Sequence, residues 1–202
     1  MKIGLDYDGT IADSNIMKSH WIKDNLNIDI PSWKTDRTSC ICELANHISI
    51  NDAEKVYNNF SEFIYSGEYA KAAPEIPGAI EGIQTLAKTH DLFIVTARFQ
   101  SHMEDMIKWL DAHNVLHLFK DYFSMRIEDK KMKCLLSKQE ICSFYDISVL
   151  VDDDERHLKK INLPNLKRIL IKNGSSDNTD NLKGIIYANS WKQILNEIGN
   201  IQ

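Results

Sequence analysis

Uninterrupted apolar runs alternate with helical patterns along this chain, and this alternation constrains its fold more than any other feature. The apolar runs lie at residues 3–5, 91–96, 147–151, 168–171 and 184–188. Strands that are apolar throughout, rather than at every second position, are typical of a parallel sheet that helices cover on both faces. The sequence therefore predicts an α/β fold with a parallel sheet.

A long helical block separates the first apolar run from the second. After Thr10 the pattern stays helical for about sixty residues, with amphipathic stripes broken at Pro31 and ending near Gly67. One stripe begins at Asn51, with Glu54 three residues on, which resembles a capping box. The segment 73–78 contains two prolines and a glycine, and we interpret it as a hinge.

Further helices are expected between the later runs. We expect one helix around Ile83, one that opens near Ser101, and one from about Leu135 to Phe144. Asp13 and Asp154 each precede a helical pattern, so either could cap a helix or remain solvated. The polar segment 173–181 is expected to be a surface loop.

Composition limits the classes of function that remain open. With 202 residues, 43% of them hydrophobic, the chain can form one core, with or without an inserted lobe. A net charge of -5 and a pI near 5.8 argue against a surface that coats nucleic acid. An anionic ligand would therefore have to be attracted locally, by a metal ion or a few placed cations.

The cysteines and the apolar segments indicate the environment of the protein. The four cysteines form no paired zinc pattern, and we interpret them as reduced thiols, mostly buried on helices. No segment approaches the roughly 18 apolar residues of a membrane span, and the chain begins with a strand-like run rather than a charged leader. We therefore expect a soluble, cytoplasmic protein without a membrane partner.

Two acidic residues, Asp6 and Asp8, stand where the first apolar run gives way to a glycine turn. If residues 3–7 form a strand, both side chains point to the same face. Two carboxylates this close repel each other unless a cation or a shared proton offsets their charge, and Mg2+ prefers oxygen ligands. This pattern indicates a carboxylate nucleophile beside a bound metal, although an ordinary turn after an edge strand would share it.

Polar groups follow two further runs. The apolar residues 92–95 lead into Thr96, Ala97 and Arg98, and the apolar residues 149–151 lead into three consecutive aspartates at 152–154. Ligands of such sheets bind at the carboxyl ends of the strands. One acidic strand end can be a solvated turn, but three polar ends on neighbouring strands favour a shared site.

These motifs together resemble the four-motif signature of the haloacid dehalogenase-like (HAD) hydrolase superfamily. The match consists of DYDGT at 6–10, then Thr96, then a lysine, then Asp152 and Asp153, and it covers nearly the whole chain. It implies a Rossmann-like catalytic core of residues 1–13 and 76–202, with residues 14–75 inserted as a helical cap. The ending at 187–191, followed by a short helix, is similar to that of 5'-nucleotidase-like members.

The resemblance also implies a role for each acidic residue. Asp6 would attack phosphorus and become an aspartyl phosphate, while Asp8 would protonate the leaving oxygen and later deprotonate water. Mg2+ would be held by Asp6, Asp153, Asp152 and the backbone carbonyl of Asp8, and would neutralise the meeting anions. Since three aspartates are consecutive, the metal-binding positions could shift by one, to include Asp154.

The same resemblance implies a phosphate-binding set. Thr96 would offer its hydroxyl, the amide of Ala97 would follow, and a lysine would pair with phosphate. Lys138 stands at the expected distance before the Asp152 strand, and Lys133 is the alternative. Arg98 could grip phosphate or substrate through its planar fork of donors, or it could be a surface arginine.

The predicted activity is Mg2+-dependent hydrolysis of a small phosphate monoester, with a nucleotide as the preferred substrate. A phosphomutase, a polynucleotide-end phosphatase, a regulatory phospho-acceptor and a non-catalytic binding protein remain alternatives. The acidic balance weakens the polynucleotide option. Aromatic residues of the helical block could stack on a base or simply pack between helices: Trp21, Trp33, Phe60 and Phe63. The oligomeric state stays open.

Overall fold

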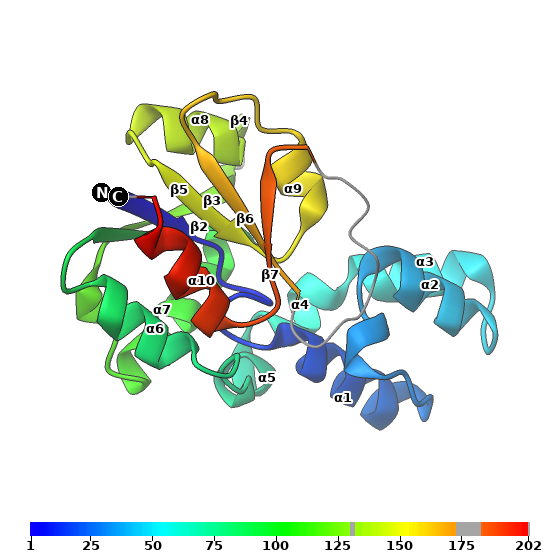
Figure 1. The fold of residues 1–202 in the computed structure, drawn as a ribbon. Helices are drawn as coiled ribbons and strands as arrows, with labels where there is room; N and C mark the ends of the chain where they lie inside the picture. The colour runs from blue at the N-terminus through cyan, green and yellow to red at the C-terminus, as the bar shows by residue number, and fades with distance from the viewer. Residues whose placement is uncertain (130–131, 173–182, 202) are drawn as a thin grey trace.

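The computed structural model describes residues 1–129, 132–172 and 183–201, and shows a seven-stranded sheet (Figure 1). The strand order is β4-β3-β2-β1-β5-β6-β7, and every neighbouring pair is parallel except β3 with β4. The strands are β1 (Lys2–Leu5), β2 (Asp91–Phe99), β3 (Phe119–Asp129), β4 (Met132–Leu135), β5 (Val149–Asp152), β6 (Lys167–Ile171) and β7 (Ile185–Ala188). The predicted α/β fold class is confirmed.

Helices cover both faces of this sheet (Figure 1). One face packs against α6 (Ala79–Leu86), α7 (Met103–Ala112) and α10 (Trp191–Gly199); the other packs against α8 (Lys138–Phe144) and α9 (Glu155–Lys159). Along β2, Leu92 and Ile94 belong to the first core, whereas Phe93 and Val95 belong to the second. Because both faces of the strand are buried, its sequence is apolar without alternation.

The helical block lies beside the carboxyl ends of the strands, at the lower right of Figure 1. It contains α1 (Ser14–Leu26), the short 3-10 helix η1 (Ser32–Lys34), α2 (Arg37–Ala45), α3 (Ile50–Asn58), α4 (Phe60–Ile64) and α5 (Gly67–Ala72). The entering and leaving segments are hydrogen-bonded: Asp13 N donates to Pro74 O and Ile76 N to Ile11 O, both at 2.8 Å. Both connections between block and sheet therefore run side by side.

Most of the predicted aromatic residues pack between helices of this block. Trp21 stacks on Phe63, with ring centroids 4.6 Å apart, and meets Phe60 edge-on at 5.8 Å. Packing is thus the observed arrangement of Trp21 and Phe63, whereas Phe60 packs here and also lines the cleft at the strand ends. Trp33 differs, because 72% of its surface is exposed.

The helix starts correct some expectations. Helix α3 is capped by Ser49, whose hydroxyl accepts a hydrogen bond from the Asp52 N–H, so the capping box expected at Asn51 is wrong. Gly67 begins α5 instead of ending a longer helix. Asp13 and Asp154 do cap α1 and α9, as one alternative had it.

The hairpin of β3 and β4 was not predicted, and it replaces the first part of an expected helix. Leu135 ends β4, and α8 begins only at Lys138, after a capping box formed by Ser137 and Glu140. Strand β3 has one exposed and one partly buried face: Tyr122 is exposed, and Phe123 is half buried. Its sequence therefore mixes polar and apolar residues and lacks the uninterrupted apolar run by which the other strands were predicted. The surface loop expected at 173–181 lies outside the described residues.

Two 3-10 turns, η2 (Gln100–His102) and η3 (Leu116–Leu118), flank α7, which therefore begins at Met103 rather than at Ser101. Cys40, Cys42 and Cys142 are free thiols, although Cys42 is exposed. Among the described residues, no helix has both the length and the apolar character that crossing a bilayer requires.

Trp191 connects the helical layer to the first strand's loop. Its ring is buried, and its Nε1 donates a hydrogen bond to Thr10 O at 2.8 Å. Gly82 of α6 packs directly on this ring: a Cβ at Gly82 would stand 2.2 Å from Trp191 Cε3. The ring can move little without breaking its bond to the loop.

We expect Gly82→Ala to lower the free energy of unfolding by about 1 to 3 kcal/mol, because overpacking outweighs the gain in helix propensity. Gly199→Ala, at the exposed end of α10 with no atom near a new Cβ, is the matched control and should be neutral or slightly stabilising. Urea unfolding of both variants measures the difference. Equal stability of Gly82→Ala and the wild type would contradict the proposed packing.

Candidate active site

Two neighbouring strands bring the acidic motifs together. Asp6 follows β1 and Asp152 ends β5, and these strands pair with Leu5 opposite Val151. The Asp6 N–H continues the ladder by donating to Val151 O at 2.8 Å. Carboxylate oxygens of Asp6, Asp152 and Asp153 lie within 4.8 Å of one another. The predicted juxtaposition of the first and last motifs is present in the structure.

Lys138 lies between two of these carboxylates. Its Nζ donates to Asp6 Oδ1 at 2.6 Å and to Asp152 Oδ2 at 2.7 Å, and all three side chains are buried. Its place in the first turn of α8 follows from the Ser137 cap. Lys133, the alternative, lies on β4, where the structure describes no side chains. Geometry therefore favours Lys138 as the lysine of the site.

The electrostatics of this cluster show how strongly the carboxylates oppose each other. Burial raises the pKa of Asp6 well above its usual value, and the nearby carboxylates add to the rise although Lys138 opposes it. Burial, followed by the charge of Asp152, raises the pKa of Asp153 to about 7. Burial acts on Asp152 in the same direction, but Lys138 and His157 outweigh it and lower the pKa of Asp152.

The arrangement fits a hard divalent cation. Three carboxylates converge, and oxygen-only ligands are those that Mg2+ prefers. The raised pKa values of Asp6 and Asp153 mark a site where added positive charge would stabilise the ionised forms. Asp152 Oδ1 also accepts a hydrogen bond from the Asp154 N–H at 3.0 Å, so both Asp152 oxygens have protein donors.

The loop after β1 packs closely against Asp153. Tyr7 O accepts hydrogen bonds from the N–H groups of Ile11 and Ala12. Gly9 has φ +76°, and a Cβ there would stand 2.1 Å from Asp153 Oδ2. Glycine is therefore required both by the left-handed backbone and by the approach of the carboxylate.

Arg98 holds the carboxylate of Asp8. Its Nε donates to Asp8 Oδ2 at 2.7 Å and its Nη2 to Asp8 Oδ1 at 2.9 Å, a bidentate pair. The guanidinium lies over the rings of Tyr7 and Tyr65, 4.6 and 4.8 Å from their centroids. Arg98 is buried, so the surface-arginine alternative is wrong. That Arg98 binds phosphate or substrate stays a prediction. In this structure two of its guanidinium nitrogens donate to the carboxylate of Asp8.

Thr96 and Ala97 lie within β2, which continues to Phe99 beyond the expected end. Both line the same cleft as Asp6. Thr96 Oγ1 accepts a hydrogen bond from the Arg98 N–H at 3.2 Å, which leaves the hydroxyl proton to be donated to another acceptor. The position of Thr96 is thus compatible with its predicted role.

A cleft of about 780 Å³ opens over these residues, between the strand ends and the helical block. The helical block contributes residues that the motifs did not predict: Asn15, Lys18, Trp33, Arg37 and Tyr57. Lys18 is buried, at 8% exposure, on the same face of α1 as Asn15, whose Oδ1 accepts a hydrogen bond from Lys18 Nζ at 3.0 Å. No pattern in the sequence singles out Lys18, because its burial depends on how the helical block packs.

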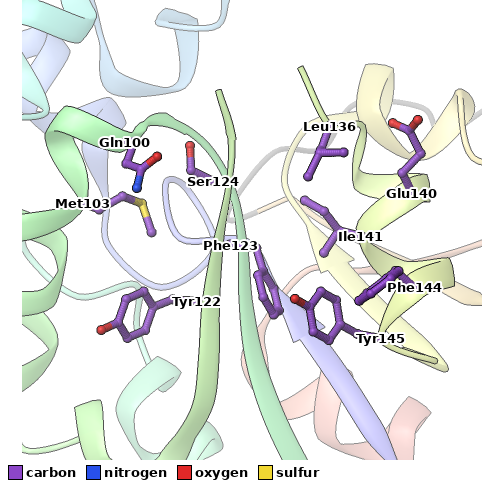
Figure 2. Close-up of a pocket in the computed structure, with 10 residues that line it drawn as sticks. All are labelled: Gln100, Met103, Tyr122, Phe123, Ser124, Leu136, Glu140, Ile141, Phe144 and Tyr145. Atoms are coloured by element: carbon purple, nitrogen blue, oxygen red, sulfur yellow. The ribbon is translucent and has the colours of Figure 1, made fainter. Parts of the chain in front are cut away.

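A second cavity, of about 540 Å³, lies between β3 and α8 (Figure 2). Figure 2 shows Phe123 and Tyr145 side by side in its centre, and their ring centroids are 4.1 Å apart. Its one carboxylate, Glu140, accepts hydrogen bonds from Ser137 in the α8 cap. This cavity is largely apolar and contains none of the predicted site residues.

Comparison with known proteins agrees with the motifs. A protein of Oceanobacillus iheyensis named "Putative nucleotidase" is 26% identical over 96% of this chain and 97% of its own length. A haloacid dehalogenase-like hydrolase family protein of Streptococcus pneumoniae superposes with a TM-score of 0.64 at 17% identity, covering 98% of this chain and 97% of that one. A Bacillus subtilis protein described as a HAD-hydrolase bound to magnesium gives 0.61 at 16% identity, covering 98% and 97%.

No protein-family model matches the chain. The structural comparisons nevertheless confirm the resemblance that the motifs carry: the chain has the fold of the HAD-like hydrolases. Two curated relatives matched by sequence each carry the name "Putative nucleotidase".

The pKa of Asp153 predicts an unusual dependence of stability on pH. In the folded, metal-free protein Asp153 keeps its proton up to a pH of about 7, whereas the unfolded chain releases it near about 4. Between these values the folded state binds more protons, so stability falls as pH rises. Asp153→Asn cannot ionise and should show a smaller fall, measured as the melting temperature in EDTA at about pH 5 and about pH 8.

Asp154→Asn is the control of opposite sign. Burial would raise the pKa of Asp154, but hydrogen bonds from Arg156 hold it at about 2, so its ionised form stabilises the fold at neutral pH. Asp154→Asn should therefore melt lower than the wild type at about pH 8, where metal-free Asp153→Asn melts higher. A melting curve of Asp153→Asn that falls with pH as steeply as the wild type's would contradict this account.

Proposed function

We propose that this protein is a Mg2+-dependent phosphatase that hydrolyses a small phosphate monoester, with a nucleotide as its preferred substrate, through an aspartyl phosphate on Asp6. The observation that carries the proposal is the placement of Asp6 at the end of β1, hydrogen-bonded by Lys138 and close to Asp153. A carboxylate so placed can act as a nucleophile once its negative charge and that of phosphate are offset. The names of the relatives support the choice of substrate class.

The acidic cluster would hold the metal ion. Asp6 and Asp153 would be direct ligands, with the backbone carbonyl of Asp8. Asp152 belongs to the same cluster, but both of its oxygens accept protein hydrogen bonds, so we assign it chiefly to positioning Lys138. Bound Mg2+ would supply positive charge that lets the nucleophile and the phosphate approach each other.

The remaining residues would divide the reaction between them. Asp6 attacks phosphorus, and the bond from phosphorus to the ester oxygen breaks. Asp8 gives that oxygen a proton and later takes one from the water that hydrolyses the aspartyl phosphate. Arg98 holds the Asp8 carboxylate in place, and this ion pair has to loosen when Asp8 carries the proton. Lys138 and the hydroxyl of Thr96 face the phosphate oxygens.

Residues 14–75 would form the cap over this site, as predicted, while 1–13 and 76–202 form the catalytic core. The two connecting segments that are hydrogen-bonded to each other at Asp13 and Pro74 would be the hinge. The cap side of the cleft carries Trp33, which is exposed, and Tyr57, so a nucleobase could stack there. A lobe in this position would also limit the access of bulk solvent to the site, while leaving room for the hydrolytic water.

Phosphate release from a panel of nucleoside monophosphates, sugar phosphates and an aryl phosphate tests the proposal, with Mg2+ and with EDTA. We expect release that requires Mg2+ and is fastest with nucleotides. Asp6→Asn should lower turnover by at least about a thousandfold while the melting temperature is retained, because the amide is nearly isosteric but a poor nucleophile. Wild-type turnover by purified Asp6→Asn would exclude this mechanism; no release from any ester by the wild type would favour a mutase, a polynucleotide substrate or a binding role.

Asp8→Asn tests the acid and base role separately. An aryl phosphate has a good leaving group that needs little protonation, so Asp8→Asn should still form the aspartyl phosphate from it. Hydrolysis of that intermediate should be slow without a base, which predicts a burst of phenolate close to the enzyme concentration, followed by slow release. The nucleotide should give no burst. Equal loss for both substrates without any burst would contradict the assigned role.

A further inference from the structure

The cations of the site differ in how far their donors are already used. Lys138 donates to Asp6 and to Asp152, and Arg98 donates twice to Asp8 and once to Tyr65 O. Both cations thus balance carboxylates of the protein itself. A phosphate dianion that enters the cleft adds negative charge. These two cations can offset that charge only in part, because they already pair with carboxylates of the protein.

Lys18 is a buried cation of the cleft, and its donors are less fully used than those of Lys138 and Arg98. It comes from α1 of the helical block and lines the cleft, and its Nζ donates a hydrogen bond to Asn15 Oδ1 at 3.0 Å. Within the described part of the chain it forms no ion pair, although Asp153 and Asp8 lie near enough to act on it electrostatically. Of the three ammonium protons, the bond to Asn15 uses only one.

Burial makes this arrangement costly unless Lys18 meets an anion. The residue is 8% exposed, and a buried ammonium without a close counter-ion loses much of its hydration. Burial lowers the pKa of Lys18, but the charges of neighbouring ionisable groups, including the carboxylates of Asp153 and Asp8, outweigh it and keep the pKa above its usual value. The lysine therefore stays charged within the cleft.

We propose that Lys18 binds a non-bridging oxygen of the substrate's phosphoryl group from the side of the helical block, opposite Lys138. The bond to Asn15 holds the ammonium at the cleft wall and leaves two of its three protons for the phosphoryl group. This inference rests on the proposed function, since it assigns the phosphoryl group to the cleft over Asp6. Lys18 is thereby a specificity residue: it favours a dianionic phosphoryl group over a neutral or singly charged one.

Binding of inorganic phosphate to the full chain in the presence of Mg2+, measured by calorimetry, tests the inference without turnover. Lys18→Met should weaken phosphate binding by about tenfold or more, because a charge-assisted hydrogen bond is lost. Its affinity for Mg2+ alone should be unchanged or tighter, since a positive charge has been removed near the carboxylates. Lys18→Arg should keep phosphate affinity within about threefold.

Lys23 supplies the matched control, because it is on the same helix, is exposed, and pairs with Asp29. Lys23→Met should bind phosphate as the wild type does. An equal loss in Lys23→Met and Lys18→Met would mean a general field effect and would overturn the inference. If Lys18→Met does not fold, Lys18→Gln, which keeps a polar end, takes its place in the same measurement.

The outcomes separate this inference from the proposed function. A wild type that hydrolyses phosphate esters while Lys18→Met binds phosphate with wild-type affinity overturns the inference and leaves the function standing. A wild type that hydrolyses no ester, with phosphate affinity lost in Lys18→Met, overturns the function and supports the inference. A wild type that binds no phosphate in the presence of Mg2+ overturns the inference as well.

Discussion

Mutual repulsion among the carboxylates at the ends of β1 and β5 is the constraint on which the site depends. Asp6 and Asp152 are buried within reach of Asp153, and Lys138 is the cation that joins two of them. Its two hydrogen bonds lower the cost of burying them, but they leave the pKa of Asp153 raised to about 7. A divalent cation bound among these carboxylates would offset this residual imbalance of charge.

The fold concentrates these charges because of strand order. β1 lies in the middle of the sheet, with β2 on one side and β5 on the other, so three polar strand ends meet at one edge. Gly9 lets the loop after β1 approach Asp153, and Trp191 holds that loop through Thr10. The helical block then covers this edge. The loop after β1 therefore carries both the contacts that fix its conformation and the first acidic residues of the site.

The sequence predicted the parts of this arrangement that have a local signal. Strands buried on both faces are apolar throughout, so β1, β2 and β5 were recognisable, and the resemblance placed their polar ends in one site. β3 was missed because its exposed face, at Tyr122, interrupts the apolar pattern. The ion pair of Arg98 with Asp8 joins residues ninety positions apart, and the cleft contribution of Lys18 depends on how the helical block packs; neither has a pattern along the chain.

Direct detection of the covalent intermediate tests the central claim that Asp6 is the nucleophile. The wild-type protein would be mixed with Mg2+ and a substrate that it turns over, quenched in acid within one turnover, reduced with borohydride and analysed by peptide mass spectrometry. Reduction converts an aspartyl phosphate to homoserine, so the account predicts homoserine at Asp6 and only when substrate and Mg2+ are both present. Homoserine at Asp8 or Asp153, or phosphate release without any modified aspartate, would contradict it.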